Sequence, residues 1–429
     1  MRVLIVSHNS FSKIYNNGKT LESIFSKFEK EEISQLFFNE TDKPDFEYCN
    51  NYFRITDVDI IKNIFNPASS CGKVIKPTPS NNLDLKKSIY HRFRKFGNIL
   101  TLFRDMLWEN PVWNKKYLLE WCEVFNPDII FLVGGKAGFS HKIAMLITIS
   151  LSRPLITFFT DDYLIYPRNK NIFNIIQKLR MKKFYNNTIN HSKLLFAIGD
   201  IMAHEYSKYF GKMFIPIMNS VSIKPYIEYE KKHKIIISYF GGLHLNRWKM
   251  IVRLTSIIKE FNEVTVNVFS IKEPSNKIKD IFCSNDINYN GKLTGNELDE
   301  AIRGSDVLLH IESDESYYRS LTKLSVSTKI PEYLMAGRFI LGYGPTEVAS
   351  MRLLFDNQIG YVISSELNKK EILLKLKGVI DNYDYRKKMG LRGYEFAINN
   401  YNNEKIATEF KKQVEFVHNN NLLNRVNSQ

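Results

Sequence analysis

Two stretches of the chain decide how it folds: residues 235–249 (IIISYFGGLHLNRWK) and residues 327–345 (STKIPEYLMAGRFILGYGP). In the first, an apolar run ends at Gly241 and Gly242, and a helix is expected to begin soon after this glycine pair. In the second, a short helical stretch leads into the apolar run Phe339 to Gly342. Strands that alternate with helices in this way are typical of a parallel sheet covered by helices on both faces.

The same alternation extends through the rest of the chain. Strands are expected at Val3 to Ser7, Ile33 to Phe38, Tyr52 to Thr56, Asp128 to Val133, Leu155 to Phe159, Leu194 to Ile198 and Phe214 to Met218, from Ile235, and at Val264 to Phe269, Asp306 to Ile311, Phe339 to Gly342 and Tyr361 to Ile363. A polar stretch with Pro225 and the charged run EYEKKHK separates the two series of strands. We therefore predict an α/β protein with two doubly wound, Rossmann-like domains that face a cleft. The predicted ranges are a first domain at 1–221, a linker at 222–234, a second domain at 235–393 and final helices at 394–429.

The composition is that of a large, basic, globular protein. The 429 residues contain 60 Lys and Arg against 45 Asp and Glu, which gives a formal net charge of +15. Because 44% of the residues are hydrophobic, the chain is not expected to be disordered. Its length exceeds what one hydrophobic core usually serves, which also favours two domains.

The four cysteines and the apolar runs indicate a cytoplasmic location. Cys49, Cys71, Cys122 and Cys283 lie far apart, without the spacing of metal ligands, so a reducing compartment is expected. The N-terminal MRVLIVS is too short for a signal-peptide core, and the longest apolar run is interrupted by Arg153 and Pro154. No transmembrane helix is therefore predicted.

Two basic stretches suggest a contact with a membrane surface. The first joins cations to aromatic and aliphatic residues and includes Lys86, Lys87, His91, Arg92, Arg94, Lys95, Arg104 and Trp108. The second contains Lys178, Arg180, Lys182 and Lys183 beside Phe184 and Tyr185. Amphipathic helices of this kind dock on an anionic leaflet at the inner face of the plasma membrane. For any single charge run an ordinary surface helix is the commoner explanation, and nucleic acid ranks last because no nucleic-acid-binding module is recognisable.

The first deciding stretch favours phosphate binding. Gly241 and Gly242 at the carboxyl end of a strand would let the backbone approach a phosphate closely and donate N–H groups to it. Arg247 and Lys249 would then supply positive charge at the mouth of the site. A glycine pair after a strand is by itself more often a plain tight turn.

The second deciding stretch favours a nucleotide. Ser327 and Thr328 stand where a helix N-cap is expected, and Lys329 adds a charge in the same turn. Glu332 follows about one turn later, where a carboxylate would accept hydrogen bonds from vicinal ribose hydroxyls, and Gly337 would end the short helix. A plain helix start with a solvated Glu332 is the alternative. The two motifs in this order, within one doubly wound domain, predict nucleotide binding.

These motifs resemble those of a known enzyme family. The FGG loop with Arg247 and Lys249, the run DVLLHIES at 306–313 and the STKIPEYLMAGRFILGYGP stretch resemble the donor-binding domain of GT-B-fold glycosyltransferases. The nearest likeness is to retaining bacterial enzymes of the glycosyltransferase family 4-like type, which build capsule, O-antigen and related surface glycans. The resemblance implies that Arg247 and Lys249 bind the donor phosphates, that Glu332 binds the ribose, and that the amides of Gly242 and of residues 327–329 lie beside the diphosphate.

The first half resembles the family more loosely. Asn17, Gly18 and Lys19 resemble the flexible glycine loop that faces the donor phosphates. FFTDDY at 158–163 and FAIGDIMAHEYSKYFG at 196–211 occupy positions of strand ends that face the other domain in that family. The resemblance also implies that the helices around Tyr394 to Phe416 cross back onto the first domain.

One position departs from the family pattern. Many retaining members carry a second glutamate eight residues before the ribose glutamate, but Leu324 stands there in this chain. The nearest acidic residues are Glu312, Asp314 and Glu315. We expect Glu312 to contribute to the donor site, with Asp314 or Glu315 as the alternative that fills the missing position by a different route, while the contacts to the donor sugar and the retaining or inverting outcome stay open.

The predicted chemistry is the transfer of a sugar from a nucleotide donor, with UDP or GDP as the expected carrier. Since no convincing DxD motif for a metal is present, Arg247, Lys249 and helix amides would neutralise the diphosphate, and we predict metal-independent activity without a cofactor. Asp161 is the candidate group that orients or deprotonates the acceptor hydroxyl, and His8 would hydrogen-bond the sugar or the acceptor. A helix cap is the common role of Asp161 or Asp162 at such a place, and His8 is the kind of residue that is more often structural.

The sequence therefore predicts a cytoplasmic, membrane-associated glycosyltransferase of bacterial surface polysaccharide biosynthesis. Its expected partners are a nucleotide-sugar donor, a glycan or lipid-linked acceptor and an anionic membrane surface, with no nucleic acid. Two alternatives stay open at this point: a GT-B-fold sugar-nucleotide 2-epimerase, and a noncatalytic nucleotide-binding protein of glycan assembly.

Overall fold

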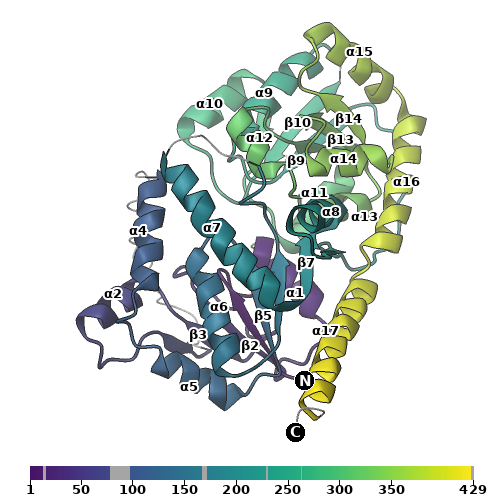
Figure 1. Cartoon of the computed structure of the whole chain (residues 1–429). Coiled ribbons are helices and arrows are strands. Elements are labelled where there is room, and N and C mark those ends of the chain that lie inside the picture. The colour runs from purple at the N-terminus through teal and green to yellow at the C-terminus, as the bar shows by residue number, and fades with distance from the viewer. Residues whose placement is uncertain (13–15, 78–96, 167–171, 229, 262, 427–429) are drawn as a thin grey trace. The chain divides into compact units, whose positions relative to one another are not determined.

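The chain forms two compact units, each built around its own sheet (Figure 1). Unit 1 comprises Met1–Asn219 and Glu404–Gln429, and unit 2 comprises Ser220–Asn403. The computed structural model describes residues 1–12, 16–77, 97–166, 172–228, 230–261 and 263–426.

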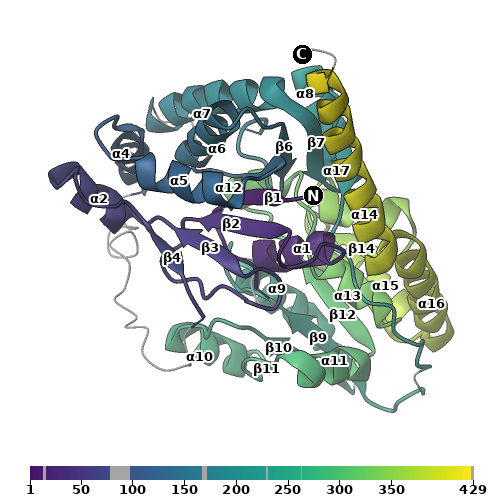
Figure 2. The same ribbon diagram turned by 90° about the horizontal axis from the view of Figure 1, so that it is seen from below.

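Unit 1 contains an eight-stranded sheet in the order β4-β3-β2-β1-β5-β6-β7-β8, of which Figure 2 shows β4 to β1 side by side. The strands are β1 (Val3–Ser7), β2 (Ile33–Phe37), β3 (Asn51–Arg54), β4 (Lys73–Ile75), β5 (Ile129–Gly134), β6 (Leu155–Phe159), β7 (Ser192–Ile198) and β8 (Ile215–Ile217). All neighbours pair in parallel except β4, which runs antiparallel to β3. Every residue of β1 is buried, as expected for a central parallel strand that is covered by helices on both faces.

The helices of unit 1 come from most of the first half and from the C-terminus. They are α1 (Asn16–Phe25), α2 (Asp57–Phe65), α4 (Gly97–Glu109), α5 (Lys116–Phe125), α6 (Gly138–Ser150), α7 (Ile172–His191), α8 (Gly199–Phe210) and α17 (Asn403–Val426). From α17, Phe410 packs against Phe25, Phe131 and Phe196, at centroid distances of 5.0, 5.6 and 5.5 Å. The C-terminal helix is thus part of the core of unit 1.

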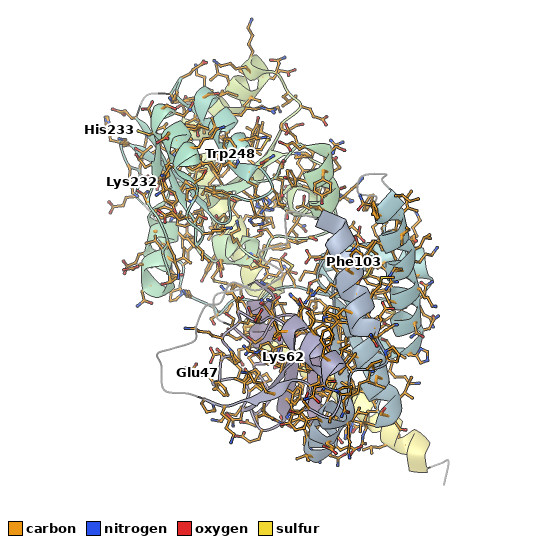
Figure 3. All side chains as sticks on the ribbon, turned by 90° about the vertical axis from the view of Figure 1, so that its left-hand side faces the viewer. Glu47, Lys62, Phe103, Lys232, His233 and Trp248 are labelled. Atoms are coloured by element: carbon orange, nitrogen blue, oxygen red, sulfur yellow. The ribbon has the colours of Figure 1, made fainter. Side chains whose placement is uncertain are left out.

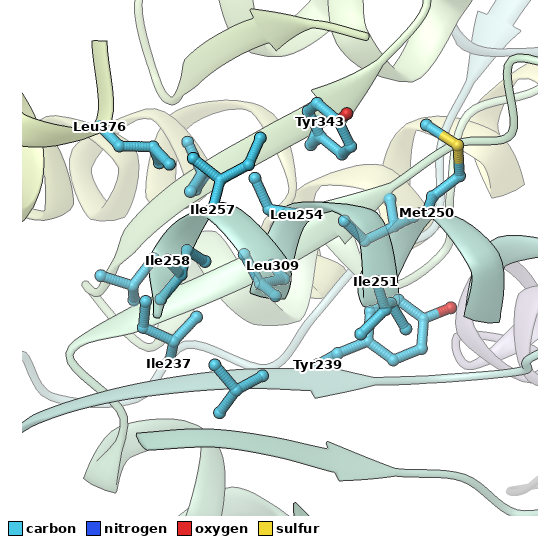
Figure 4. Packing of buried hydrophobic residues seen from close by; sticks show 14 of the residues in the cluster. Ile237, Tyr239, Met250, Ile251, Leu254, Ile257, Ile258, Leu309, Tyr343 and Leu376 are labelled. Atoms are coloured by element: carbon cyan, nitrogen blue, oxygen red, sulfur yellow. The ribbon is translucent and has the colours of Figure 1, made fainter. Parts of the chain in front are cut away.

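Unit 2 contains a six-stranded parallel sheet in the order β11-β10-β9-β12-β13-β14. The strands are β9 (Ile235–Phe240), β10 (Val264–Phe269), β11 (Ile287–Tyr289), β12 (Val307–Ile311), β13 (Phe339–Gly344) and β14 (Tyr361–Ser364). The helices are α9 (Arg247–Ile258), α10 (Asn276–Ser284), α11 (Gly295–Gly304), α12 (Ser316–Thr322), α13 (Ile330–Met335), α14 (Ala349–Asp356), α15 (Lys369–Ile380) and α16 (Tyr383–Asn400). Aliphatic side chains of α9 pack on β9 and β12 to form the core on one face of this sheet (Figure 4).

The predicted α/β class with two doubly wound sheets is confirmed. The short strands β4 and β11 were absent from the sequence-based prediction, because three residues at a sheet edge show little periodicity. All four cysteines are free thiols, and three of them are buried.

The stretch predicted as a linker packs onto unit 2. The buried guanidinium of Arg338 donates from Nη1 to the carbonyl oxygen of Ile227 at 2.8 Å, and Tyr394 donates to the carbonyl oxygen of Lys224, also at 2.8 Å. The boundaries of the two units differ from the predicted domain ranges. Residues 222–228, predicted as part of a linker, belong to unit 2, and so does the whole of α16, whose last residues were predicted to pack on the first domain. Unit 1 resumes at Glu404.

Candidate functional site

The strand order of unit 2 reverses between β9 and β12, which lie next to each other in the sheet. In open parallel sheets, ligands bind outside the carboxyl ends of the strands at such a switch point. β9 ends at Phe240 and is followed by Gly241 and Gly242, and β12 ends at Ile311 and is followed by Glu312. The glycine pair and the glutamate that the sequence singled out therefore lie at the position where this fold binds ligands. We call this part of the molecule the switch-point site.

Gly241 allows the Lys329 ammonium to lie directly against the backbone of the turn. The φ angle of Gly241 is +151°, and a Cβ atom at this residue would lie 2.0 Å from Lys329 Nζ, so no other residue fits here without displacing the lysine. The same Nζ lies 4.9 Å from the centroid of the Tyr239 ring. Removal from water, followed by the positive charge of Arg247, lowers the pKa of Lys329 to about 7. The ammonium group of Lys329 therefore lies beside the turn after β9 and gains or loses its proton near neutral pH.

Arg247, at the start of α9, forms an ion pair with Glu312. Arg247 Nη2 lies 3.1 and 3.0 Å from Glu312 Oε1 and Oε2, and the two side chains are only 13% and 3% exposed. Burial raises the pKa of Glu312, but the charge of Arg247 and its hydrogen bonds to the carboxylate outweigh burial and leave that pKa below its usual range. His310 of β12 is buried, and burial lowers its pKa to about 4. Glu312 therefore orients Arg247.

The other cations of α9 are paired in the same manner. Lys249 Nζ lies 2.9 Å from Glu315 Oε1, and Arg253 Nη1 lies 2.6 Å from Asp314 Oδ2. Glu312, Asp314 and Glu315 thus each face a cation of α9. The sequence-based prediction gave the neutralisation of a diphosphate to Arg247 and Lys249. In the structure both of these residues are bound to carboxylates, whereas Lys329 contacts the ring of Tyr239.

Two details of the predicted amide cradle are wrong. The N-cap of α13 is Lys329, not Ser327 or Thr328, and the amide of Ser327 donates to Ser350 Oγ at 2.9 Å. The amide of Gly241 donates to the carbonyl oxygen of Phe269 at 2.9 Å, as part of the sheet. These two N–H groups already have acceptors, so they would not bind a phosphate.

The rest of this stretch lies close to the prediction. Glu332 is the third residue of α13 and is partly exposed, and its charge raises the pKa of Lys329 against the larger lowering effects. Gly337 follows the C-cap of α13 with a φ of +65°, as expected of a glycine that ends a helix.

Two aromatic residues of the switch-point site were missed by the sequence analysis. Tyr239 lies under Lys329 and donates to the carbonyl oxygen of Gly242 at 2.8 Å. His244 is exposed but lies close to Gly242, and its crowded surroundings together with Arg247 lower its pKa to about 4. Tyr239 looked like an ordinary strand residue in the sequence, and only its position two residues before Gly241 pointed to the site.

In unit 1, His8 lies directly after β1, as predicted. Its side chain is exposed, yet the protein atoms crowded around it and the charge of Arg104 lower its pKa to about 4. The imidazole is therefore neutral at pH 7 and would act as a hydrogen-bonding group.

Asp161 and Asp162, which follow β6, have different surroundings. Asp162 is buried and accepts hydrogen bonds from the amides of residues 164–166 and from the Tyr206 hydroxyl. This is the capping role that the sequence analysis weighed for both residues. Asp161 is partly exposed, and Tyr163 Oη lies 3.4 Å from its carboxylate.

The predicted glycine loop is the first turn of a helix. Asn17, Gly18 and Lys19 belong to α1, which begins at Asn16. A Cβ atom on Gly18 would lie 2.6 Å from the carbonyl oxygen of Ser10, so this glycine allows the helix to pack closely on the segment after β1. The prediction of a flexible loop at these residues is therefore wrong.

The first basic stretch lies mostly outside the described residues, because Lys86, Lys87, His91, Arg92, Arg94 and Lys95 fall within 78–96. Its described end is structural. Arg104 Nε lies 2.8 Å from Asp57 Oδ1, and buried Trp108 donates to the same oxygen at 2.6 Å. Within the described ranges, no helix is long and apolar enough to cross a bilayer.

A search of the same ranges for metal ligands finds no group of three or more His, Cys, Asp or Glu side chains suited to hold a metal ion. Metal-independent activity stays a prediction.

The chain was compared with known proteins. Residues 254–412 match a family model described as "Glycosyl transferase-like". No curated protein matches the sequence significantly.

Solved structures resemble the chain over nearly its whole length. HepE from Anabaena, solved in complex with UDP-glucose, has a TM-score of 0.61 at 11% identity and covers 97% of this chain and 99% of its own. TarM from S. aureus has a TM-score of 0.63 at 11% identity, with 98% and 99% covered. A glycosyltransferase from Rickettsia africae has a TM-score of 0.57 at 12% identity, with 97% of both chains covered.

At these identities the structural likeness establishes the fold, and the family match, which covers most of unit 2, describes that part of the chain as glycosyl transferase-like. The chain therefore has the fold of the GT-B glycosyltransferases, and its residues 254–412 form a glycosyl transferase-like domain.

Proposed function

We propose that the protein transfers a sugar from a nucleotide-sugar donor to a glycan or lipid-linked acceptor in bacterial cell-surface polysaccharide biosynthesis, without a metal ion. The observation that carries this proposal is the switch-point site, where Lys329 lies against the Gly241 turn beside the buried Arg247–Glu312 pair. The UDP-glucose in the HepE complex supports a UDP-linked sugar as the first donor to test.

In the proposed reaction the bond between the anomeric carbon and the diphosphate breaks, and the acceptor hydroxyl forms a new bond to that carbon. The diphosphate leaves with the bonding electron pair, so its developing negative charge must be stabilised. We assign this role to Lys329 with Arg247, and we assign the ribose hydroxyls to Glu332. In unit 1, Asp161 would receive the proton of the acceptor hydroxyl, and neutral His8 would hydrogen-bond the sugar or the acceptor.

Nucleotide binding is the first test. Of UDP, GDP and ADP, one should raise the melting temperature of the protein, since a ligand that binds only the folded state stabilises it by mass action. Gly241→Ala should abolish this shift, because the new methyl group displaces Lys329. Gly378→Ala on α15 is the matched control: a Cβ there meets nothing within 4 Å, and the shift should persist. Equal melting-temperature shifts in the two variants would show that the nucleotide does not bind at the switch-point site.

Sugar transfer is the second test. The preferred nucleotide's sugar conjugate is incubated with the protein and an undecaprenyl-phosphate-linked or soluble glycan acceptor, with and without EDTA. Release of the nucleoside diphosphate together with a glycosylated acceptor in both samples is the expected result. Loss of activity in EDTA would refute metal independence. Conversion of the donor to its epimer, without transfer, would instead identify a 2-epimerase.

A further inference from the structure

Lys329 differs from the other cations of the switch-point site because it has no acidic partner. The three cations of α9 at this site are each paired with a carboxylate. Among the residues that the structure describes, none forms a hydrogen bond or an ion pair with Lys329 Nζ, which lies against the Tyr239 ring and the backbone of Gly241. The chemistry of this amine is therefore not determined by a neighbouring acid.

Lys249 provides the contrast. Its Nζ lies 5.9 Å from the ring centroid of Trp248, which Figure 3 labels, and 2.9 Å from Glu315 Oε1. Lys249 and Lys329 thus both lie near an aromatic ring, but only Lys249 has a carboxylate that stabilises its charged form. Burial and the nearby Arg247 charge lower the pKa of Lys329 to about 7. At neutral pH about half of this side chain is therefore an uncharged amine with a free lone pair.

The Tyr239 ring and the glycine turn hold this amine in one place. Tyr239 is buried, and its hydroxyl donates to the carbonyl oxygen of Gly242 at 2.8 Å, which fixes the ring. Lys329 Nζ lies 4.9 Å from the centroid of this ring and occupies the space that a side chain at Gly241 would need. Lys329 is nevertheless partly exposed, so a small molecule can reach it. A positioned, uncharged amine is a nucleophile.

The surroundings of the Lys329 amine attract an anion. Arg247 stays charged close to it. The amide of Gly242 donates to no atom of the residues that the structure describes, so it can donate to a phosphate oxygen. A small reagent that carries a phosphate group would therefore be bound with its other end beside Lys329.

We propose that Lys329 is a site of acylation by small acyl phosphates such as acetyl phosphate. The amine attacks the carbonyl carbon, the bond between this carbon and the phosphate oxygen breaks, and the phosphate leaves with the bonding electron pair. The nitrogen gives its proton to the departing phosphate, so the products are ε-N-acetyl-lysine and inorganic phosphate. Arg247 and the Gly242 amide stabilise the negative charge of the leaving phosphate.

Acylation would inactivate the switch-point site. The acetylated side chain carries no charge and is larger than the ammonium group, which already lies against Gly241. A nucleotide-sugar donor would lose one of the two cations assigned to its diphosphate, and a bound donor would in turn protect the amine. This regulatory consequence rests on the proposed function, whereas the acylation itself does not.

Labelling with isotopically marked acetyl phosphate, followed by peptide mass spectrometry, tests the proposal on the full-length protein. At a pH of about 7, Lys329 should be acetylated at least about tenfold faster than Lys249 and than the exposed lysines Lys370 and Lys375 of α15, because a lysine with an ordinary pKa is almost entirely protonated there. Equal rates at the four lysines would overturn the proposal.

The pH dependence of labelling is the second measurement. Between pH values of about 7 and 9 the rate at Lys370 should rise about 100-fold, whereas the rate at Lys329 should rise only about twofold. A 100-fold rise at Lys329 would contradict the proposal. Burial raises the pKa of Tyr239 to about 12 and lowers the pKa values of His244 and His310 to about 4, so these neighbours keep their charge over this range. The charged and titratable groups around Lys329 are these three residues with Arg247, Glu312 and Glu332.

Two further comparisons test the binding of the phosphate group and the role of the turn. Inorganic phosphate should slow the labelling of Lys329 and leave that of Lys370 unchanged. Gly241→Ala displaces Lys329 and should reduce its rate to that of Lys370, while the control Gly378→Ala should not. A rate at Lys329 that responds neither to phosphate nor to Gly241→Ala would refute the proposal.

Nucleotide protection separates this proposal from the proposed function. The nucleoside diphosphate that raises the melting temperature should slow acetylation at Lys329 and not at Lys370. If a nucleotide binds and sugar is transferred, but Lys329 reacts no faster than Lys370, the acylation site is refuted and the proposed function stands. If Lys329 is acetylated selectively, but no nucleotide protects it and no sugar is transferred, the proposed function is refuted and the acylation site stands.

Discussion

At the scale of single residues, the switch-point site combines one cation of adjustable charge with one fixed ion pair. Lys329 has a pKa near 7 without ligand, because it is drawn out of water and lies near Arg247. Arg247 stays charged and is held in place by Glu312. A bound diphosphate would add negative charge beside Lys329 and raise its pKa.

The first prediction concerns the pH dependence of nucleotide binding. Above a pH of about 7 the unbound protein loses the Lys329 proton, so the complex holds more protons than the free protein and affinity falls as the pH rises. Between pH values of about 7.5 and 8.5, the dissociation constant of the preferred nucleoside diphosphate should rise by up to about tenfold in calorimetric titrations. Lys329→Arg, which stays charged, should flatten this profile. Parallel profiles for the two proteins would contradict the assignment.

The second prediction concerns the energy of the buried ion pair. Glu312→Ala and Arg247→Ala should each lower the free energy of unfolding by about 3 kcal/mol or more, because each leaves a charge that has little access to water and has lost its main partner. The double variant should cost much less than the sum. The same cycle on Lys249 and Glu315, which are 50% and 44% exposed, should give a coupling below about 1 kcal/mol. Equal couplings from the two denaturation cycles would contradict the structural role of Glu312.

At the scale of elements, the segments that follow the strands place a buried carboxylate close to a more exposed one. After β6, Asp162 satisfies three successive amides and the Tyr206 hydroxyl and so holds the turn, while Asp161 is partly exposed. The same division is present after β12, where Glu312 is buried and Glu315 is exposed.

The third prediction separates the two aspartates after β6. Asp162→Ala should lower the free energy of unfolding by about 2–3 kcal/mol, because buried hydrogen-bond donors lose their acceptor. Asp161→Asn should change that free energy by less than about 1 kcal/mol and lower kcat/KM for transfer by about 100-fold. Denaturant titrations and initial-rate kinetics measure the two effects. Full activity in Asp161→Asn would remove Asp161 from the proposed chemistry.

At the scale of the whole molecule, unit 1 is built from two separate parts of the chain, because helix α17, which follows unit 2, packs into its core. Phe410 of α17 joins aromatic residues from α1, β5 and β7, segments that lie far from it in the sequence. The stability of unit 1 therefore depends on a helix that follows unit 2 in the sequence, whereas the residues of the switch-point site all belong to unit 2.

The fourth prediction follows from this arrangement. Phe410→Ala should destabilise unit 1 by about 3–5 kcal/mol, through lost burial and the cavity left behind. Phe416→Ala on the same helix is the matched control, because Phe416 is exposed and should change the stability by less than about 0.5 kcal/mol. The nucleotide-induced shift should persist in both proteins. Loss of nucleotide binding in Phe410→Ala at a temperature where unit 1 is still folded would contradict the independence of the two units.

Most of the fold could be predicted from the sequence, and less of the site. Buried parallel strands such as β1 and β6 are largely apolar runs, so the local sequence pattern was sufficient to predict them. The edge strands β4 and β11 were missed because pairing with one neighbour leaves a weak pattern. Asn17 to Lys19 were assigned to a loop because they resemble the glycine loop of the family, but close packing on Ser10 explains the glycine at position 18.

The amino-acid sequence by itself determined the α/β class, the two series of strands and the glycine pair at the switch-point site, because these depend on local periodicity and on glycine. Only the tertiary structure decided which charges are paired. Glu312 lies 65 positions from Arg247, and Lys329 meets the turn after β9 from a separate helix. Pairing, burial and the resulting pKa shifts arise from distances between segments remote in the chain, which no local pattern records.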